Sequence, residues 1–271
     1  MPRAFPCNSP VIMGILNVTP DSFSDGGRHL DLQDAVGHAK RMIDDGANII
    51  DIGGESTRPF SDPVDEDEEL SRVLPVIETV RAISDIPISV DTYKASVADK
   101  ALRAGADIIN DISGLTYDDR MAGVIAEHDA YAVIMHIRGT PKHMQENPVY
   151  ENVIAEIMAF LRRQSSYAVR AGIDEGKIMI DPGIGFGKRV EDNLRILKML
   201  NVFKELGKPV LIGTSMKSFI GKVTGSPLEE RVEGTLATLA VAFMNGADIF
   251  RVHDVAGAKK VLTMVKAVMD A

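Results

Sequence analysis

Polar and ionisable residues follow the short apolar runs of this 271-residue chain, with at least one after each run. They are Asn17, Glu55, Thr57, Arg58, Asp91, Asn110, Asp111, His136, Arg138, Asp181, Ser215, Lys217, Arg251 and His253. Any one of them alone would be read as a strand-end cap or a turn former. Together they favour a polar site for a small molecule, because the same placement recurs along the chain.

Two carboxylates, one amide and one ammonium stand out in this set: Asp91, Asn110, Asp181 and Lys217. This combination can satisfy the donors and acceptors on the edge of a heterocycle such as a pteridine or a purine. A metal site or the acid–base pair of a glycosidase also uses carboxylates. No His-rich spacing points to zinc, and an aromatic content of 5% without Trp argues against sugar stacking.

Arg251 and His253 lie two residues apart at the end of the last apolar run. In a strand, this spacing directs both side chains to the same face. Many α/β barrels bind phosphate after their last strands, so we expect an anion site here. The alternative is a surface pair in which these two residues contact Asp254.

Eight short apolar runs must position these residues. They span residues 11–15, 48–54, 86–91, 107–112, 131–136, 177–181, 209–213 and 248–252. Nearly continuous apolar runs of this length are typical of parallel strands that are buried on both faces. Amphipathic segments separate them, and several end in Gly before the next run, as in DDGANII, RAGADII and NGADIF. Gly is the expected helix C-cap there.

Eight strand–helix repeats predict a (β/α)8 TIM barrel, an α/β fold that needs about 250 residues. An open doubly wound sheet is the alternative, but it usually contains fewer strands. The sequence has no linker or low-complexity tract, so we expect a single domain over residues 1–271. TIM barrels carry their active sites at the carboxyl ends of the strands, and the polar residues lie at these ends.

Composition limits the partners and the compartment. A formal net charge of −9 disfavours nucleic-acid binding, because an acidic surface repels phosphates. The lone Cys7 cannot form an internal disulfide, which is typical of a reducing compartment. No segment has the character of a signal peptide or a transmembrane helix. We therefore expect a cytoplasmic protein that does not bind membranes.

Two long segments resemble signature loops of the dihydropteroate synthases: NVTPDSFSDGG at 17–27 and DIGGESTRP at 51–59. Other similar segments follow in the family's order: SVDTYKASVADKALRAGADIINDISG, MHIRGTPKHMQ, DPGIGFGK and RVHDV. The resemblance runs from Met13 to about Val255. It implies a TIM-barrel transferase of folate biosynthesis. Such an enzyme joins 6-hydroxymethyl-7,8-dihydropterin pyrophosphate to p-aminobenzoate and releases 7,8-dihydropteroate and pyrophosphate.

The resemblance also implies roles for residues of this chain. The pterin pocket is expected at Asp91, Asn110, Met135, Asp181 and Lys217. Pyrophosphate is expected at Asn17, Arg251 and His253, with Asn17 also a ligand of Mg²⁺. The p-aminobenzoate site and its loops are expected at Phe23, Thr57, Arg58, Pro59, Phe186 and Ser218. The catalytic residues are expected to be Asp91, Lys217, Arg251 and His253.

The implied reaction uses no protein nucleophile. Mg²⁺, Arg251 and His253 stabilise the leaving pyrophosphate, Asp91 stabilises the pterin cation, and the neutral amine of p-aminobenzoate attacks. The loop from Thr19 to Arg28 is expected to close over the site. The resemblance further implies a sulfonamide target, and a homodimer formed through the last two helices, at about 229–245 and 256–270.

Two positions depart from the family pattern. Met216 stands in TSMKSF where Arg is usual, and Phe60 follows STRP where Gly is common. Because of these two residues, the resemblance does not determine the shape of the p-aminobenzoate site or the sensitivity to sulfonamides. The alternative functions are a pterin-dependent methyltransferase domain and a non-catalytic pterin-binding paralogue. The first lacks the SFSDGG and STRP loops, and the second is expected to have lost residues such as Asn17 or Lys217, which are present here.

Overall fold

The computed structural model describes residues 9–19 and 28–271. Within this part of the chain, strands and helices alternate. The strands are β1 (Val11–Asn17), β2 (Ile49–Gly53), β3 (Ile88–Asp91), β4 (Ile108–Asp111), β5 (Tyr131–Met135), β6 (Ile178–Asp181), β7 (Leu211–Ile212) and β8 (Ile249–Val252). The α-helices are α1 (Arg28–Asp44), α2 (Glu66–Ile83), α3 (Ala95–Arg103), α4 (Met121–Glu127), α5 (Val153–Arg170), α6 (Val190–Lys198), α7 (Ser218–Thr224), α8 (Val232–Met244) and α9 (Val255–Met269). Short 3₁₀ helices are η2 (Glu175–Lys177), η3 (Leu200–Leu206) and η4 (Leu228–Glu230).

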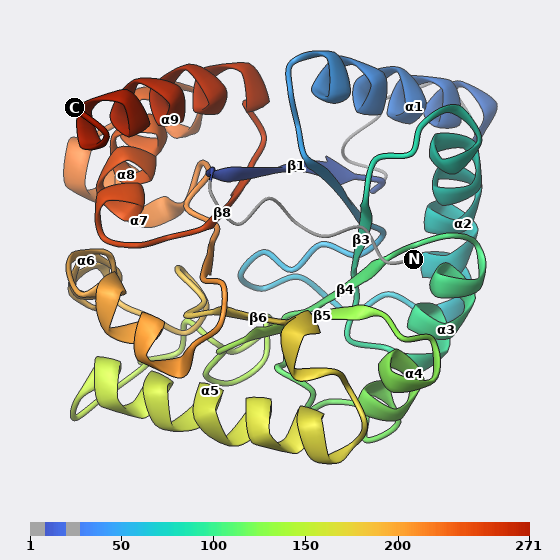
Figure 1. Ribbon diagram of the computed structural model, residues 1–271, viewed down its shortest axis with the longest axis horizontal. Coiled ribbons are helices and arrows are strands. Elements are labelled where there is room, and N and C mark those ends of the chain that lie inside the picture. Colours follow the sequence, from blue (N-terminus) through green and yellow to red (C-terminus); the bar gives the residue numbers. More distant parts are fainter. Residues whose placement is uncertain (1–8, 20–27) are drawn as a thin grey trace.

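The strands form a closed, all-parallel barrel. Neighbouring strands pair in the order β6-β5-β4-β3-β2-β1-β8-β7. A parallel bridge between Ile180 and Val210 then joins the two ends of this sheet. Figure 1 shows the strands in the middle and the helices arranged around them. The predicted (β/α)8 TIM barrel is confirmed.

Two apolar layers stabilise the barrel. The outer layer lies between the strands and the helices, where residues such as Ile50 and Ile52 are fully buried. The inner layer is a separate buried cluster that every strand but β3 supplies: Val11, Met13, Ile49, Ile108, Val133, Met179, Leu211 and Ile249. Because both faces are buried, apolar residues occur on both faces of the strands, as their sequences predicted.

The inward-facing residues change from apolar to polar along the barrel axis. Residues two apart in a strand point to the same side, and on β2, β4, β6 and β8 the inner apolar residue is followed by a polar one. The successive inward pairs are Ile49 and Asp51, Ile108 and Asn110, Met179 and Asp181, and Ile249 and Arg251. Apolar packing therefore fills the amino-terminal part of the interior, and polar groups gather at the carboxyl ends of the strands.

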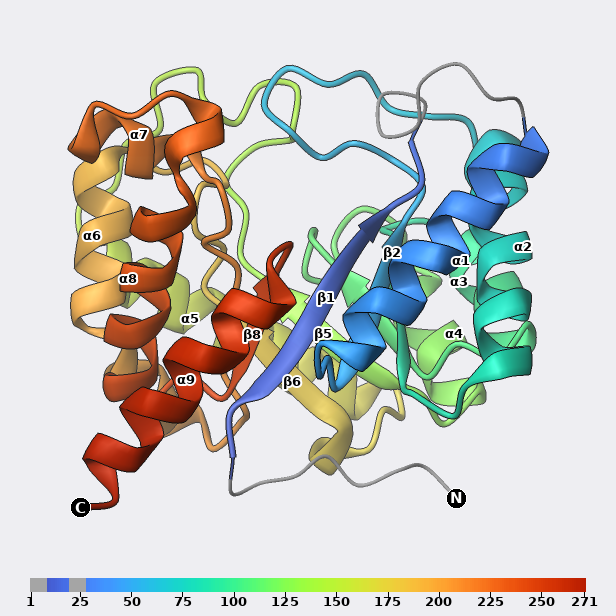
Figure 2. The same cartoon turned by 90° about the horizontal axis from the view of Figure 1, so that it is seen from above.

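The long loops lie at the polar end of the barrel. Figure 2 shows the β2–α2 loop in cyan and the β5–α5 loop in yellow-green at the end towards which β1 points, whereas the C-terminus lies at the opposite end. We call the carboxyl ends of the strands, together with these loops, the mouth.

The helix ends follow the signals seen in the sequence. Asp65 caps α2, and its side chain accepts a hydrogen bond from the backbone N–H of Asp67. Gly46, Gly105 and Gly246, which follow α1, α3 and α8, have φ angles of 98°, 111° and 95°. None of the helices in the described part of the chain is long and apolar enough to cross a membrane.

Candidate active site

Strand register brings residues of the first four strands to one level of the mouth. Asn17 pairs with Gly53, Gly53 with Asp91, and Asp91 with Asn110. Since Gly53 has no side chain, the space in front of it stays open. A Cβ atom on Gly53 would lie 3.7 Å from Asn17 Oδ1 and 3.9 Å from Asp91 Oδ2. The amide oxygen of Asn17 and the carboxylate of Asp91 therefore face the same space.

Arg251 joins two carboxylates across the barrel interior. Its Nε donates to Asp51 Oδ2 at 2.6 Å, and its Nη2 donates to Asp91 Oδ2 at 2.7 Å. Burial opposes the charge on the guanidinium, but the two carboxylates outweigh burial and raise the pKa of Arg251. Asp51 Oδ1 and Asp91 Oδ1 are buried without a hydrogen-bond partner among the described residues. Asp91 therefore keeps one oxygen with which it can accept a hydrogen bond from a ligand.

Burial raises the pKa of Asp91 well above the usual carboxylate range. Arg251 opposes this shift, whereas the charge of Asp51 adds to it. Two carboxylates that share one guanidinium repel each other, so part of the proton affinity of Asp91 originates in Asp51.

Asp181 and Lys217 lie on the other side of the mouth. Asp181 Oδ1 accepts a hydrogen bond from the backbone N–H of Gly183 at 2.6 Å, and burial raises the pKa of Asp181 to about 6. Lys217 precedes α7, and its Nζ lies 4.0 Å from the centre of the Phe186 ring. Burial and the charge of Arg251 lower the pKa of Lys217 to about 8.

An apolar cluster lies beside these polar groups. It consists of Ile112, Met135, Ile137, Met144 and Phe186, with Tyr93 packed against it. Met135 is the register partner of Asp181, so an apolar side chain and a buried carboxylate stand next to each other on β5 and β6. Apolar surface with a few fixed polar groups is the usual environment for a flat heterocycle.

His253 lies at the exposed edge of the mouth, two residues beyond Arg251. Its Nδ1 is 2.9 Å from Ser215 Oγ. Burial within the mouth, Arg251 and then Arg58 lower the pKa of His253. A cavity of about 150 Å³ opens next to this pair and is lined by Ser215, Met216, Val232, Thr235, Leu236, Leu239, Val252, His253 and Asp254. The cations around His253 therefore disfavour its protonated form.

Comparisons with known proteins identify the family. A family model for pterin binding enzymes matches residues 13–253. The dihydropteroate synthase of Bacillus subtilis is 54% identical over 261 residues, which cover 96% of this chain and 88% of that protein. The chain belongs to the dihydropteroate synthase family.

Solved dihydropteroate synthases share the fold along almost the whole chain. The Yersinia pestis enzyme, solved in a sulfonamide drug complex, has a TM-score of 0.93 and 42% identity, covering 98% of this chain and 97% of that chain. The Xanthomonas albilineans enzyme in complex with 7,8-dihydropteroate has a TM-score of 0.90 and 42% identity, covering 98% of this chain and 96% of that chain.

The residues predicted for the p-aminobenzoate side lie on separate segments. Thr57, Arg58 and Pro59 belong to the β2–α2 loop, where Arg58 and Pro59 are exposed. Phe186 is buried in the apolar cluster, and Ser218 is the exposed first residue of α7. Phe23, with residues 20–27, lies outside the described residues.

Both positions that depart from the family pattern have left-handed backbone conformations. Phe60 has a φ of 68° and an exposed fraction of 67%. Met216 has a φ of 59°; its N–H donates to Thr235 Oγ1 at 3.1 Å, and its carbonyl accepts from Arg231 Nη1 at 3.2 Å. A bulky side chain strains the backbone in this region. Two backbone hydrogen bonds to residues of α8 and its N-cap thus fix Met216, whereas the side chain of Phe60 extends into solvent.

Two buried charged residues of the site were not predicted. Asp51 had no assigned role, although its spacing of two from Gly53 in β2 already directs it inward. Lys188, at the end of the glycine-rich segment, is buried. Its Nζ lies 3.0 Å from both His136 Nδ1 and Phe186 O, and burial lowers its pKa to about 7. Lys188 therefore contacts both the segment that carries Phe186 and His136, the residue that follows β5.

Proposed function

We propose that this chain condenses 6-hydroxymethyl-7,8-dihydropterin pyrophosphate with p-aminobenzoate, giving 7,8-dihydropteroate and pyrophosphate for folate biosynthesis. The observation that carries this proposal is the convergence of Asp91, Asp181 and Lys217 at one mouth, in a chain that matches its family over residues 13–253. The product in the Xanthomonas albilineans complex, 7,8-dihydropteroate, supports the same chemistry here.

The pterin ring is assigned to the apolar cluster and the carboxylates beside it. The pterin edge presents N–H groups, and the buried carboxylates of Asp91 and Asp181 can accept hydrogen bonds from them. It also presents a carbonyl, to which the ammonium of Lys217 can donate. Asn110 supplies both a donor and an acceptor at the same level of the barrel. Met135, in the apolar cluster beside Asp181, packs near the flat ring.

Arg251 and His253 are assigned to the pyrophosphate. When the bond from the pterin methylene to oxygen breaks, negative charge develops on the leaving pyrophosphate and positive charge on the methylene. Arg251 is already held in place by Asp51 and Asp91, so its charge is oriented before the reaction starts. Asp91, which lies between Arg251 and the pterin residues, stabilises the cation. His253 takes up a proton as the anion offsets the surrounding cations.

Asn17 is assigned as the protein ligand of Mg²⁺. Its Oδ1 faces the open space in front of Gly53, beside Asp91 Oδ2, and oxygen donors of this kind suit a hard divalent cation. The described residues include no group of three or more His, Cys, Asp or Glu side chains that could hold a metal. The substrate and water would therefore supply the other ligands. When bound, the ion neutralises charge on the leaving pyrophosphate.

Thr57, Arg58, Pro59, Phe186 and Ser218 are assigned to p-aminobenzoate, with Phe23 from the preceding loop. The amine of p-aminobenzoate is neutral near pH 7 and can attack the methylene without prior loss of a proton. The carboxylate of p-aminobenzoate is an anion, for which Arg58 is the cation on the β2–α2 loop. A sulfonamide would compete for the same place.

The chain is proposed to act as a cytoplasmic, single-domain homodimer. Helices α8 and α9 pack against each other and expose a set of apolar side chains: Val241, Met244, Met264, Val268 and Met269. Their exposed fractions lie between 40% and 64%. An apolar group of this kind supports an interface with a second copy.

Titration of p-aminobenzoate separates this function from pterin binding alone. In one calorimetric titration, p-aminobenzoate is added to protein in the presence of pyrophosphate and Mg²⁺, and the heat of binding is measured. In a second titration, the pterin pyrophosphate is added to the protein alone. We expect both ligands to bind, and p-aminobenzoate to bind more weakly to Arg58→Ala. Protein that binds the pterin pyrophosphate but never p-aminobenzoate contradicts the proposal and indicates a non-catalytic binder.

A further inference from the structure

The β2–α2 loop begins at a buried carboxylate that accepts three hydrogen bonds. Glu55 accepts from Tyr93 OH at 2.6 Å, from Lys94 Nζ at 2.5 Å and from the backbone N–H of Val64 at 3.1 Å. Tyr93 and Lys94 follow β3, whereas Val64 lies at the far end of the same loop as Glu55. One side chain therefore joins both ends of this loop to the neighbouring strand.

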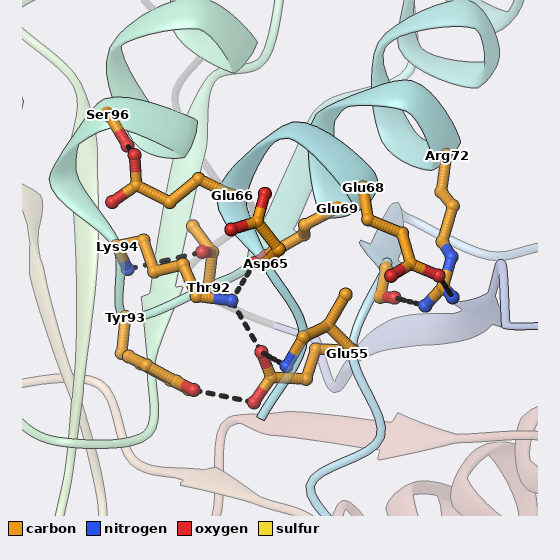
Figure 3. A network of polar contacts seen from close by, with 12 residues as sticks. Glu55, Asp65, Glu66, Glu68, Glu69, Arg72, Thr92, Tyr93, Lys94 and Ser96 are labelled. Atoms are coloured by element: carbon orange, nitrogen blue, oxygen red, sulfur yellow. Dashed lines mark hydrogen bonds and ion pairs between the residues drawn. The ribbon is translucent and has the colours of Figure 1, made fainter. Parts of the chain in front are cut away.

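Lys94 connects Glu55 to a second buried carboxylate on α2. Its Nζ donates to Glu69 Oε2 at 2.5 Å, and Figure 3 shows the ammonium between the two carboxylates. Helix α2 approaches this closely because residue 54 is glycine. A Cβ atom on Gly54 would lie 2.8 Å from Val73 Cγ1 and 3.0 Å from Glu69 Cγ. Buried ion pairs of this kind are sensitive to the loss of one partner.

The opposite side of the loop is also held. The backbone N–H of Phe60 donates to the carbonyl of Pro141 in the β5–α5 loop at 3.1 Å. Ser61 Oγ donates to the carbonyl of Arg58 at 2.8 Å. The segment that carries Thr57 and Arg58 is thus held at both ends: by the hydrogen bonds of Glu55 on one side, and by the hydrogen bond from Phe60 to the β5–α5 loop on the other.

We propose that Glu55 is a positioning residue for the second substrate. It fixes the β2–α2 loop through Tyr93, Lys94 and Val64, so that Thr57 and Arg58 stay at the mouth where p-aminobenzoate binds. The inference rests on the proposed function. Glu55 is not expected to touch either substrate, and its hydrogen bonds go to Tyr93, Lys94 and Val64 rather than to the pterin residues on β3, β4 and β6.

A purely structural role for Glu55 predicts a different result. If the carboxylate only stabilised the fold, its loss would lower the free energy of unfolding and reduce the amount of active enzyme, with both KM values unchanged. A positioning role acts on one substrate. The split between the KM for p-aminobenzoate and the KM for the pterin pyrophosphate therefore distinguishes the two.

Steady-state kinetics of three variants test the inference. Glu55→Gln is expected to raise the KM for p-aminobenzoate about tenfold or more, because three donors lose a charged acceptor and hydrogen bonds to a charged group are stronger than those to a neutral one. The KM for the pterin pyrophosphate is expected to stay within about twofold. Tyr93→Phe removes one of the three donors and is expected to raise the same KM about threefold. Glu68→Gln is the matched control, because Glu68 is an exposed carboxylate on α2 that pairs with Arg72 and not with Lys94.

Tyr93→Phe also covers the case in which Glu55→Gln does not fold. It keeps the ring, which packs edge to face on Tyr117 with the ring centres 5.4 Å apart. An unchanged KM for p-aminobenzoate in a folded Glu55→Gln or Tyr93→Phe variant overturns the inference, as does an equal rise of both KM values. Wild-type protein without turnover refutes the proposed function itself, so the two failures are distinguishable.

A double-mutant cycle tests whether Glu55 acts through Arg58. If it does, Glu55→Gln should change the KM for p-aminobenzoate by less than about twofold in an Arg58→Ala background, because the group that it positions is already absent. If the fold-changes in the KM for p-aminobenzoate of the two single variants multiply in the double variant, Glu55 does not act through Arg58.

Discussion

Substitution of Asp51 by Asn removes one buried charge beside the reacting groups and keeps the side-chain size. Asp51 is not expected to touch the substrate. It shares Arg251 with Asp91, and its charge contributes to the raised pKa of Asp91. Asp51→Asn is therefore expected to lower the pKa of Asp91 towards the ordinary carboxylate range.

The geometry sets the size of this change. The two carboxylates bind two nitrogens of one guanidinium at 2.6 Å and 2.7 Å. Two unit charges about 6 Å apart repel by about 3 kcal/mol at an effective dielectric constant of about 20. One pKa unit corresponds to about 1.4 kcal/mol, so the pKa of Asp91 is expected to fall by about 1–2 units.

The assay is the pH dependence of kcat/KM for the pterin pyrophosphate. If ionised Asp91 stabilises the pterin cation, activity is lost as the pH falls through the pKa of Asp91 in the free enzyme. Asp51→Asn should then move this acid limb to lower pH by about 1–2 units. The maximum kcat/KM is also expected to fall, because Arg251 loses a partner. The comparison therefore uses the pH at which the acid limb lies and not the maximum.

Glu68→Gln, which removes an exposed carboxylate from α2, is the charge-matched control and should leave the limb in place. An acid limb that stays at the same pH in Asp51→Asn, or moves to higher pH, would refute the coupling between Asp51 and Asp91.

Three further predictions concern the fold and the assembly. Phe60→Gly should raise the free energy of unfolding in urea by about 0.5–1 kcal/mol, because it relieves the strain of a φ of 68° and removes a side chain that is 67% exposed; no gain would show that the loop tolerates Phe60 without strain. Gly183→Ala should lower the unfolding temperature, at a cost of about 2 kcal/mol or more, because its Cβ would lie 1.9 Å from the carbonyl oxygen of His136. Gly207→Ala, with a φ of 65° and nothing within 4 Å, is its control and should cost only about 1 kcal/mol. Met264→Glu, at a position that is 64% exposed on α9, should convert a dimer to a monomer in sedimentation with an unchanged fold, and an unaltered oligomer would place the interface elsewhere.

The barrel could be predicted because each strand carries its own local signal. Eight apolar runs and the glycines after the helices are readable within a few residues each, and parallel pairing then brings their carboxyl ends together. The same rule predicts that Asp91 and Asn110, which end neighbouring apolar runs, lie side by side. Their register across β3 and β4 agrees with that expectation.

Contacts between distant segments had no comparable signal. Asp51 and Arg251 are 200 residues apart in sequence, so their ion pair appears only when the barrel closes between β1 and β8. Lys188 has the sequence character of an ordinary surface lysine, because charged residues are seldom fully buried. The left-handed conformations of Phe60 and Met216 also escaped prediction, since neither residue type favours them.

The most direct test of the central claim is a turnover assay with mass detection. Purified protein is mixed with 6-hydroxymethyl-7,8-dihydropterin pyrophosphate, p-aminobenzoate and Mg²⁺. Dihydropteroate is expected to form, and to disappear with EDTA and in Lys217→Ala. It is expected to persist in Lys222→Ala, which removes an exposed lysine from α7, the helix that Lys217 precedes. Folded protein that binds the pterin pyrophosphate and forms no dihydropteroate would contradict the central claim.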